Sequence, residues 1–144
     1  MSSVYAESSA VLRWLLGSDG AATIQPALAE ARAVVTSALT SAEVARTLHR
    51  LRAGNAIDAR ALDSAWARYS AAAAHWHFYA VSDSVLARVS QAFPREPVRT
   101  LDAIHLATAA LFSREVTLAA VLSFDARIRE NAQGLGLTVM PPDL

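Results

Sequence analysis

The segment RTLDAIHLATAALF, residues 99–112, combines a long apolar pattern with one acid near its start. Leucine, isoleucine and phenylalanine recur among alanines on nearly every side, which predicts a helix packed between other elements. Asp102 falls in the first turn of that helix, where the helix dipole favours a carboxylate by roughly 0.3–1 kcal/mol. A chemical role for this acid is favoured only if other acids occupy equivalent places in the fold.

Strand and helix patterns alternate along the rest of the chain. The apolar runs that predict strands are residues 4–6, 33–37, 78–82, 116–123 and 137–140. The further stretches that predict helices are residues 8–16, 21–31, 40–54, 58–76, 83–93 and 125–133. Because such alternation is typical of a mostly parallel sheet with helices on both faces, we predict a three-layer α/β/α fold. No repeat or linker divides the chain, so we expect one domain over residues 1–144.

The composition indicates a globular protein, since 53% of the 144 residues are hydrophobic and 18% are charged. No uncharged apolar run reaches the roughly 18 residues that a membrane span needs, and no signal-peptide pattern is present. We therefore expect a cytoplasmic protein with no membrane partner. Cysteine is absent, which excludes disulfides and thiolate metal sites.

The charge pattern narrows the function classes further. The formal net charge is zero and all 13 basic residues are arginines, so a nucleic-acid site requires a local patch. The absence of lysine excludes a P-loop and disfavours phosphatases and receiver domains that need a lysine beside an acidic pocket. No GxGxxG follows a predicted strand, which argues against a dinucleotide-binding fold.

Three more acids lie at the ends of predicted strands. Glu7 and Asp125 closely follow two strands, and Glu43 falls in the first turn of the helix after a third. Ligands of open parallel sheets bind beyond the carboxyl ends of the strands. We therefore expect Glu7, Glu43, Asp102 and Asp125 to point into one crevice.

Each acid also has a structural explanation. Thr40-x-x-Glu43 fits a capping box, and Glu7, Asp102 and Asp125 fit helix caps or first-turn partners of the helix dipole. As a set, converging carboxylates repel one another unless a cation is present. Mg²⁺ or Mn²⁺ suits oxygen ligands, retains waters and supports phosphodiester hydrolysis. The sequence thus predicts metal-dependent hydrolysis without a serine or cysteine nucleophile.

Four segments together resemble the PIN-domain nucleases, in particular the VapC-type toxins of bacterial toxin–antitoxin pairs. They are VYAESSAVLRWLL (4–16), VVTSALTSAEVARTLHR (34–50), RTLDAIHLATAAL (99–111) and VLSFDARIRENAQGLGLTVMPP (121–142). The resemblance implies the α/β/α architecture and a ribonuclease that cleaves structured RNA with Mg²⁺ or Mn²⁺. It also implies a homodimer and a cognate antitoxin whose tail covers the acidic groove.

The resemblance assigns roles to individual residues. Glu43, Asp102 and Asp125 match three acids of the family's site, and Ser123 matches a hydroxyl that orients a carboxylate or water. These acids would bind one or two ions and position the attacking water.

The first acidic position departs from the family pattern. The family usually has aspartate there, whereas this chain has Glu7, followed by Ser9 at the small hydroxyl position. Glutamate is one methylene longer, and Mg²⁺ demands near-ideal octahedral geometry. The departure predicts a shifted or weakened ion, a preference for Mn²⁺, or loss of activity.

Arginines lie close to the acids in sequence. Arg46 and Arg50 share a helix face with Glu43, which predicts RNA phosphate contacts or, alternatively, a surface Glu43–Arg46 pair. Arg99 and Arg127 flank the other acids and either neutralise them or are solvated.

The histidines and aromatic residues are expected to have structural roles. His75 and His77 lack a third ligand at a suitable spacing, which disfavours zinc. His105, one turn after Asp102, is expected to be packed and hydrogen-bonded rather than a general base. The aromatic side chains expected in the core or a dimer contact, rather than stacking on bases, are Trp66, Tyr69 and Trp76.

Three functions remain open. The first is a metal-dependent endoribonuclease toxin neutralised by an antitoxin. The second is a catalytically impaired PIN-like module that holds RNA or an antitoxin, which the Glu7 departure favours. The third is a nuclease directed at DNA, which the neutral net charge disfavours.

Overall fold

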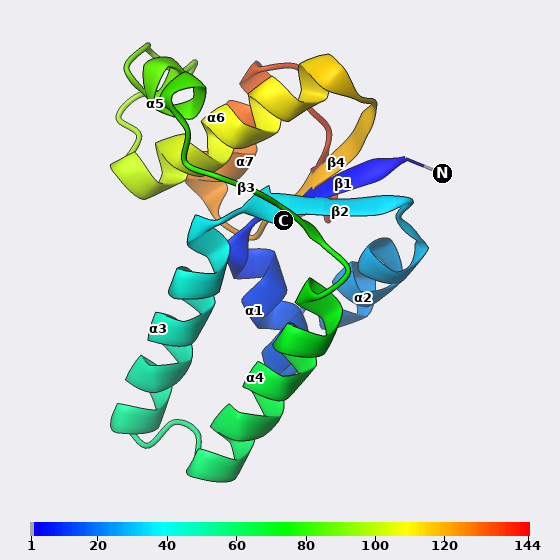
Figure 1. The fold of residues 1–144 in the computed structure, drawn as a ribbon, viewed down its shortest axis with the longest axis vertical. Helices are drawn as coiled ribbons and strands as arrows, with labels where there is room; N and C mark the ends of the chain where they lie inside the picture. Colours follow the sequence, from blue (N-terminus) through cyan, green and yellow to red (C-terminus); the bar gives the residue numbers. More distant parts are fainter. Residues whose placement is uncertain (1) are drawn as a thin grey trace.

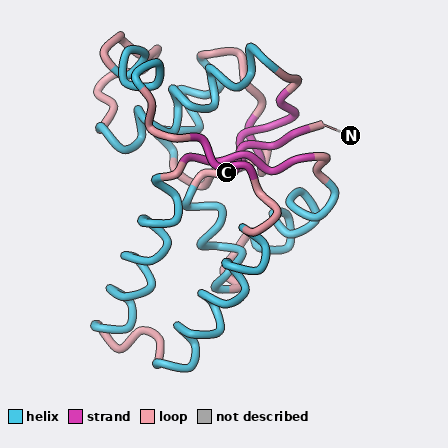
Figure 2. The backbone as a smooth tube through the Cα atoms, viewed as in Figure 1, coloured by secondary structure: helices cyan, strands magenta, loops and turns pink. Residues whose placement is uncertain are grey.

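The central layer is a sheet of five parallel strands (Figures 1 and 2). The computed structural model describes residues 2–144. The strands are β1 (Ser3–Ala6), β2 (Ala33–Ser37), β3 (His77–Tyr79), β4 (Leu118–Leu122) and β5 (Val139–Met140), in the spatial order β3-β2-β1-β4-β5. The predicted three-layer α/β/α class is confirmed.

Helices cover both faces of this sheet (Figure 1). The helices are α1 (Ser8–Leu16), α2 (Ala21–Glu30), α3 (Leu39–Ala53), α4 (Ala59–Ala73), α5 (Asp83–Val89), α6 (Thr100–Glu115) and α7 (Ala126–Gly134). Figure 1 shows α1 to α4 on one face and α5 to α7 on the other, with α3 and α4 forming a long antiparallel pair. None of these helices is long and apolar enough to span a bilayer over the described chain.

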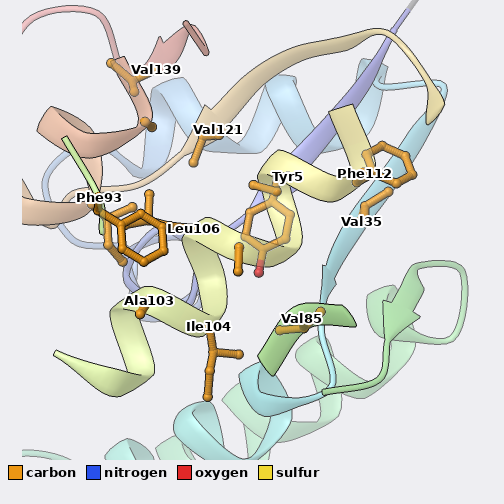
Figure 3. Close-up of a cluster of buried hydrophobic side chains, with 14 residues drawn as sticks. Tyr5, Val35, Val85, Phe93, Ala103, Ile104, Leu106, Phe112, Val121 and Val139 are labelled. Atoms are coloured by element: carbon orange, nitrogen blue, oxygen red, sulfur yellow. The ribbon is translucent and has the colours of Figure 1, made fainter. Parts of the chain in front are cut away.

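Two hydrophobic clusters, one on each face, hold the layers together. Successive strand residues point to opposite faces, so Tyr5 packs in one cluster while Val4 and Ala6 pack in the other. Figure 3 shows Tyr5 near Leu106 of α6 in the first cluster. The alternation in β1 therefore joins both helix layers to the middle of the sheet.

The apolar helix predicted over residues 99–112 is α6, which packs directly on the sheet. Every residue from Ala103 to Ala109 is buried, as its pattern predicts. Leu101 was also expected to be buried, but 48% of its surface is exposed. The helix continues to Glu115, three residues beyond the predicted end.

Several predicted elements are shorter in the structure. The strand predicted over 78–82 is the three-residue edge strand β3, whose pairing ends where Ala38 N donates to Tyr79 O at 2.8 Å. The helix predicted over 83–93 ends at Val89, and the Ser90 hydroxyl bonds back to Leu86 O at 3.0 Å. Four other elements are also shorter than predicted. The helices predicted over 21–31 and 58–76 are α2 over 21–30 and α4 over 59–73, and the strands predicted over 116–123 and 137–140 are β4 over 118–122 and β5 over 139–140.

The carboxyl ends of β1 and β4 lie side by side. Ala6 pairs with Leu122, and the next amide along β1, that of Glu7, donates to Leu122 O at 3.0 Å. The parallel arrangement thereby places the residues after these strands, Glu7 and Ser123, at one edge of the sheet.

Candidate functional site

The four acids singled out in the sequence all lie at this edge. Glu7 is the N-cap of α1, Asp125 is the N-cap of α7, and Asp102 is in the first turn of α6. Glu43 lies in the second turn of α3 rather than its first, because the helix begins at Leu39. The carboxyl ends of parallel strands therefore gather acids that are far apart in sequence.

Asp102 and Asp125 line one cavity of about 530 Å³. The pKa of Asp102 is raised above its usual range, first by partial burial and then by the charges of Asp125 and Glu7; Glu43 adds a smaller rise, and His105 acts in the opposite direction. This electrostatic coupling is the signature of acids that share a site. Arg99 and Arg127 line the same cavity.

Glu43 belongs to a buried chain of side chains. His105 Nε2 lies 2.5 Å from Glu43 Oε1, and His105 Nδ1 lies 2.8 Å from the Tyr5 hydroxyl. Because an ionised carboxylate only accepts, the Nε2 nitrogen carries a proton and donates it to Glu43. Burial raises the pKa of the Tyr5 phenol well above its usual range, so the phenol that contacts Nδ1 stays protonated. The expectation that His105 is packed and hydrogen-bonded is confirmed.

The Glu7 carboxylate is enclosed by serines. Oε1 accepts from Ser8 Oγ at 2.9 Å and from Ser9 N at 3.1 Å. Oε2 accepts from Ser123 Oγ at 2.7 Å and also from Ser9 Oγ. The residue is 4% exposed, so it differs from Asp102, which borders the cavity.

The loop between β4 and α7 is anchored by several hydrogen bonds. Ser123 N donates to Met140 O at 3.1 Å, and Ser123 O accepts from Arg129 at 3.0 Å. Phe124 N donates to Ser9 Oγ at 2.8 Å, and Asp125 N donates to Ser123 Oγ at 3.1 Å. Asp125 therefore projects from a loop with little freedom. Burial lowers the pKa of Arg129.

The capping-box alternative for Glu43 is wrong. The N-cap position is Ala38, and the Ser37 hydroxyl accepts from Leu39 N at 3.1 Å. Thr40 is buried, and its hydroxyl lies 2.6 Å from that of Thr36. Glu43 is consequently available for His105. The cap readings of Glu7 and Asp125 are confirmed, because each accepts from its helix backbone.

In the described chain, the arginines near the acids form no ion pairs with them. Glu43 pairs with His105 and not with Arg46, so the alternative of a surface Glu43–Arg46 pair is wrong. Arg46 and Arg50 are exposed on α3. Across residues 2–144, neither Arg99 nor Arg127 has an acid within 4.0 Å, so neither forms a salt bridge with the acids beside it.

The aromatic residues of α4 and the following turn form a connected row. Tyr69 is buried, and its ring centroid lies 5.2 Å from that of Trp66 and 5.8 Å from that of Trp76. Tyr69 therefore belongs to the core, as expected, while Trp66 is 37% exposed. His77 begins β3 whereas His75 precedes it, so the two histidines do not share a strand face.

The acids suit a hydrated hard cation better than a closed metal cage. In the part of the chain that is described, no three His, Asp or Glu side chains are gathered closely enough to hold an ion by themselves. Mg²⁺ is commonly held by one or two carboxylates, with waters and substrate oxygens completing its shell. Asp102 and Asp125 at one cavity, with the raised pKa of Asp102, meet that requirement.

The comparison with known proteins agrees with this geometry. Residues 4–134 match the sequence pattern described as "PIN domain". The chain belongs to the PIN domain family. Two relatives from Mycobacterium tuberculosis align over nearly their full length. The protein named "Ribonuclease VapC35" is 32% identical over 142 residues, covering 96% of each chain, and "Ribonuclease VapC46" is 34% identical over 142 residues, covering 99% of each chain.

Sequence reasoning missed several residues of this PIN-domain site. Tyr5 and Ser8 appear in the sequence only as strand and helix-cap residues, yet they bond to His105 and Glu7. The contact of Arg129 could have been predicted from the sequence. Arg129 lies one helical turn after Asp125, so its side chain can reach the loop that holds this acid.

Proposed function

We propose that this PIN-domain protein is a metal-dependent endoribonuclease toxin that acts in the cytoplasm and is neutralised by a cognate antitoxin. The observation that carries the proposal is the cavity lined by Asp102 and Asp125, where burial and then the neighbouring carboxylates raise the pKa of Asp102. The two relatives are named ribonucleases, which supports RNA as the substrate class, and the resemblance to VapC-type toxins supports a toxin as the biological context.

Asp102, Asp125 and Glu43 are the residues assigned to hold Mg²⁺ or Mn²⁺. A bound ion of this kind lowers the pKa of a coordinated water and offsets the negative charge that develops on the phosphodiester. His105 fixes the orientation of the Glu43 carboxylate, and the anchored loop fixes Asp125. Since the protein groups are held before substrate arrives, little reorganisation is needed when RNA binds.

RNA phosphates beside the cleaved bond are assigned to arginines. Arg99 and Arg127 line the acidic cavity without an acidic partner in the described chain, so their guanidinium groups are available for phosphate oxygens. Arg46 and Arg50, exposed on α3, would extend this contact along the strand. A homodimer would double the number of such sites on one particle.

The proposal is tested by RNA cleavage with purified protein freed of antitoxin. Cleavage is expected with Mg²⁺ or Mn²⁺ and is expected to stop with a chelator and in Asp102→Asn. Asp63→Asn, which removes an exposed acid of α4 away from the acidic cavity, is the matched control and is expected to cleave normally. Cleavage that survives chelation or Asp102→Asn contradicts the mechanism. Matched DNA substrates separate the ribonuclease from a DNA-directed enzyme.

One observation favours the second candidate, a PIN-like module that binds RNA or antitoxin without cleaving. Within residues 2–144 no three acids are drawn together at ligand distance. If the protein binds RNA but cleaves none with either ion, and Glu7→Asp restores cleavage, the binding module is the better account.

A further inference from the structure

The Glu7 carboxylate has no oxygen left for a further partner. A carboxylate offers about four lone-pair positions. Ser8 Oγ and Ser9 N occupy two of them on Oε1, while Ser9 Oγ and Ser123 Oγ occupy two on Oε2. The side chain is 4% exposed, so all four positions are filled inside the protein.

The other three acids differ from Glu7 in this respect. Asp125 uses Oδ1 to accept from Ile128 N, and Glu43 uses Oε1 for His105. Among the hydrogen bonds of residues 2–144, Asp125 Oδ2, Glu43 Oε2 and both oxygens of Asp102 have no protein donor. Each of these acids therefore presents at least one oxygen to an ion, and Glu7 presents none.

The donors around Glu7 lead directly to the loop that carries Asp125. Ser123 Oγ donates to Glu7 and accepts from Asp125 N. Ser9 Oγ also donates to Glu7 and accepts from Phe124 N. Because the carboxylate can only accept, it forces both hydroxyls to use their protons on Glu7 and to leave their lone pairs for the two backbone amides. Two consecutive amides are thus fixed by one buried charge.

We propose that Glu7 is a positioning residue that orients Asp125 through Ser9 and Ser123, and that Glu7 is not itself a metal ligand of this chain. This inference rests on the proposed metal-dependent function. It assigns a hydrogen-bonding role to the glutamate that departs from the family's expected aspartate.

The extra methylene of glutamate fits this role. Glu7 caps its own helix through Ser9 N and at the same time reaches Ser123 at the end of another strand. An aspartate here would keep the cap, but its shorter side chain draws the carboxylate back toward β1 and away from Ser123. The longer side chain therefore couples β1 to the loop after β4.

The test counts the water molecules on bound Mn²⁺ by water-oxygen and water-proton relaxation. Replacing a ligand carboxylate by an amide that leaves the ion opens a position for one water, whereas replacing a positioning carboxylate does not. Glu7→Gln is expected to keep the wild-type number of coordinated waters, and Asp125→Asn is expected to gain one. A gain of one water in Glu7→Gln overturns the inference while leaving the proposed function intact.

A second measurement needs no substitution and so does not depend on the variants folding. Protein labelled with ¹³C at the glutamate side-chain carboxyl is loaded with Mn²⁺ and examined by electron–nuclear double resonance. At most one strongly coupled glutamate carboxyl, that of Glu43, is expected, because the Glu7 carboxylate stays bonded to the serines. Two coupled carboxyls overturn the inference, and wild-type protein that takes up no Mn²⁺ overturns the proposed function together with it.

Discussion

His105 of α6 lies 2.5 Å from Glu43 of α3, through its Nε2 and the Oε1 of the acid. The histidine is 1% exposed, and its other nitrogen contacts the hydroxyl of the fully buried Tyr5. One imidazole thus connects the central strand β1, the buried helix α6 and Glu43 of α3. A buried group of this kind sets both the stability of the core and the direction of the carboxylate.

The first prediction concerns this histidine. His105→Ala leaves the Tyr5 hydroxyl and one Glu43 oxygen without their partner, so we expect a loss of about 3 kcal/mol in the free energy of unfolding. Partners that orient a metal-binding group typically contribute roughly 10–100-fold to metal affinity or activity. Mn²⁺ affinity, measured by calorimetry on folded protein, should fall by that factor.

Tyr5→Phe is the milder control. It removes only the hydroxyl that hydrogen-bonds to Nδ1 and should cost about 1–2 kcal/mol, with a smaller fall in Mn²⁺ affinity than in His105→Ala. Equal Mn²⁺ affinities in His105→Ala and the wild type would show that the His105 contact only stabilises the fold.

The second prediction concerns the arginines at the cavity. Arg99→Gln with Arg127→Gln removes two phosphate contacts, and each contact to single-stranded nucleic acid contributes about 0.7 to the salt slope. The slope of log affinity against log salt should therefore decrease by about 1.4 for a non-cleaved RNA. Arg32→Gln, next to the amino end of β2 and thus at the opposite edge of the sheet, is the control. Equal slopes in the double variant and the wild type argue against phosphate contacts.

The third prediction concerns the glycine that faces Phe124. At Gly20 φ is +92°, and an added Cβ would lie 2.3 Å from Phe124 Cζ. Backbone strain and overpacking together predict a loss of about 3 kcal/mol in Gly20→Ala. Gly17 also has a positive φ of +63° but open space around it, so Gly17→Ala should cost only about 1 kcal/mol. Urea unfolding measures the loss of stability in both variants. Equal losses would contradict the prediction, because they would mean that the Phe124 ring moves aside without cost.

The fourth prediction follows from the raised pKa of Asp102. An acid whose pKa is higher in the folded state than in the unfolded state favours folding at low pH, and that contribution is lost as pH rises through the folded-state pKa. In the metal-free protein at pH 7, Asp102→Asn should therefore raise the free energy of unfolding. The gain should shrink as the pH is lowered toward the usual carboxyl range.

Asp83→Asn is the matched control for this effect. Asp83 is exposed in the first turn of α5, so its removal should cost about 0.3–1 kcal/mol through the helix dipole. Urea unfolding of both variants in the presence of a chelator gives the comparison. A loss of stability in Asp102→Asn similar to that in Asp83→Asn would contradict the electrostatic coupling of the acids.

The sequence predicts most of the architecture because periodicity and local signals determine it. The range 33–37 is a strand, α1 ends before Gly17, and α6 is buried along its middle, as expected. The convergence of the acids also follows, since parallel strands place their carboxyl ends at one edge. Strand length at the sheet edge was overestimated because pairing, not propensity, decides where β3 ends.

The hydrogen bonds of the site could not be predicted in the same way. The Glu43–His105 contact joins residues 62 positions apart, and the Glu7–Ser123 contact joins residues 116 positions apart. The local sequence predicted a different partner for Glu43, since Thr40-x-x-Glu43 has the spacing of a capping box. In the structure Glu43 bonds to His105 instead of capping its helix. A rule that uses only local sequence cannot predict this long-range contact.

The most direct test of the account is where Mn²⁺ binds. Crystals of the antitoxin-free protein soaked in Mn²⁺ should give an anomalous peak at about 2.0–2.5 Å from oxygens of Asp102 and Asp125. Asp102→Asn crystals under the same conditions should lose it. Peaks only at other surfaces, or no peak at Asp102 and Asp125 when calorimetry shows the ion to be bound, would contradict the claim that these carboxylates form the metal site.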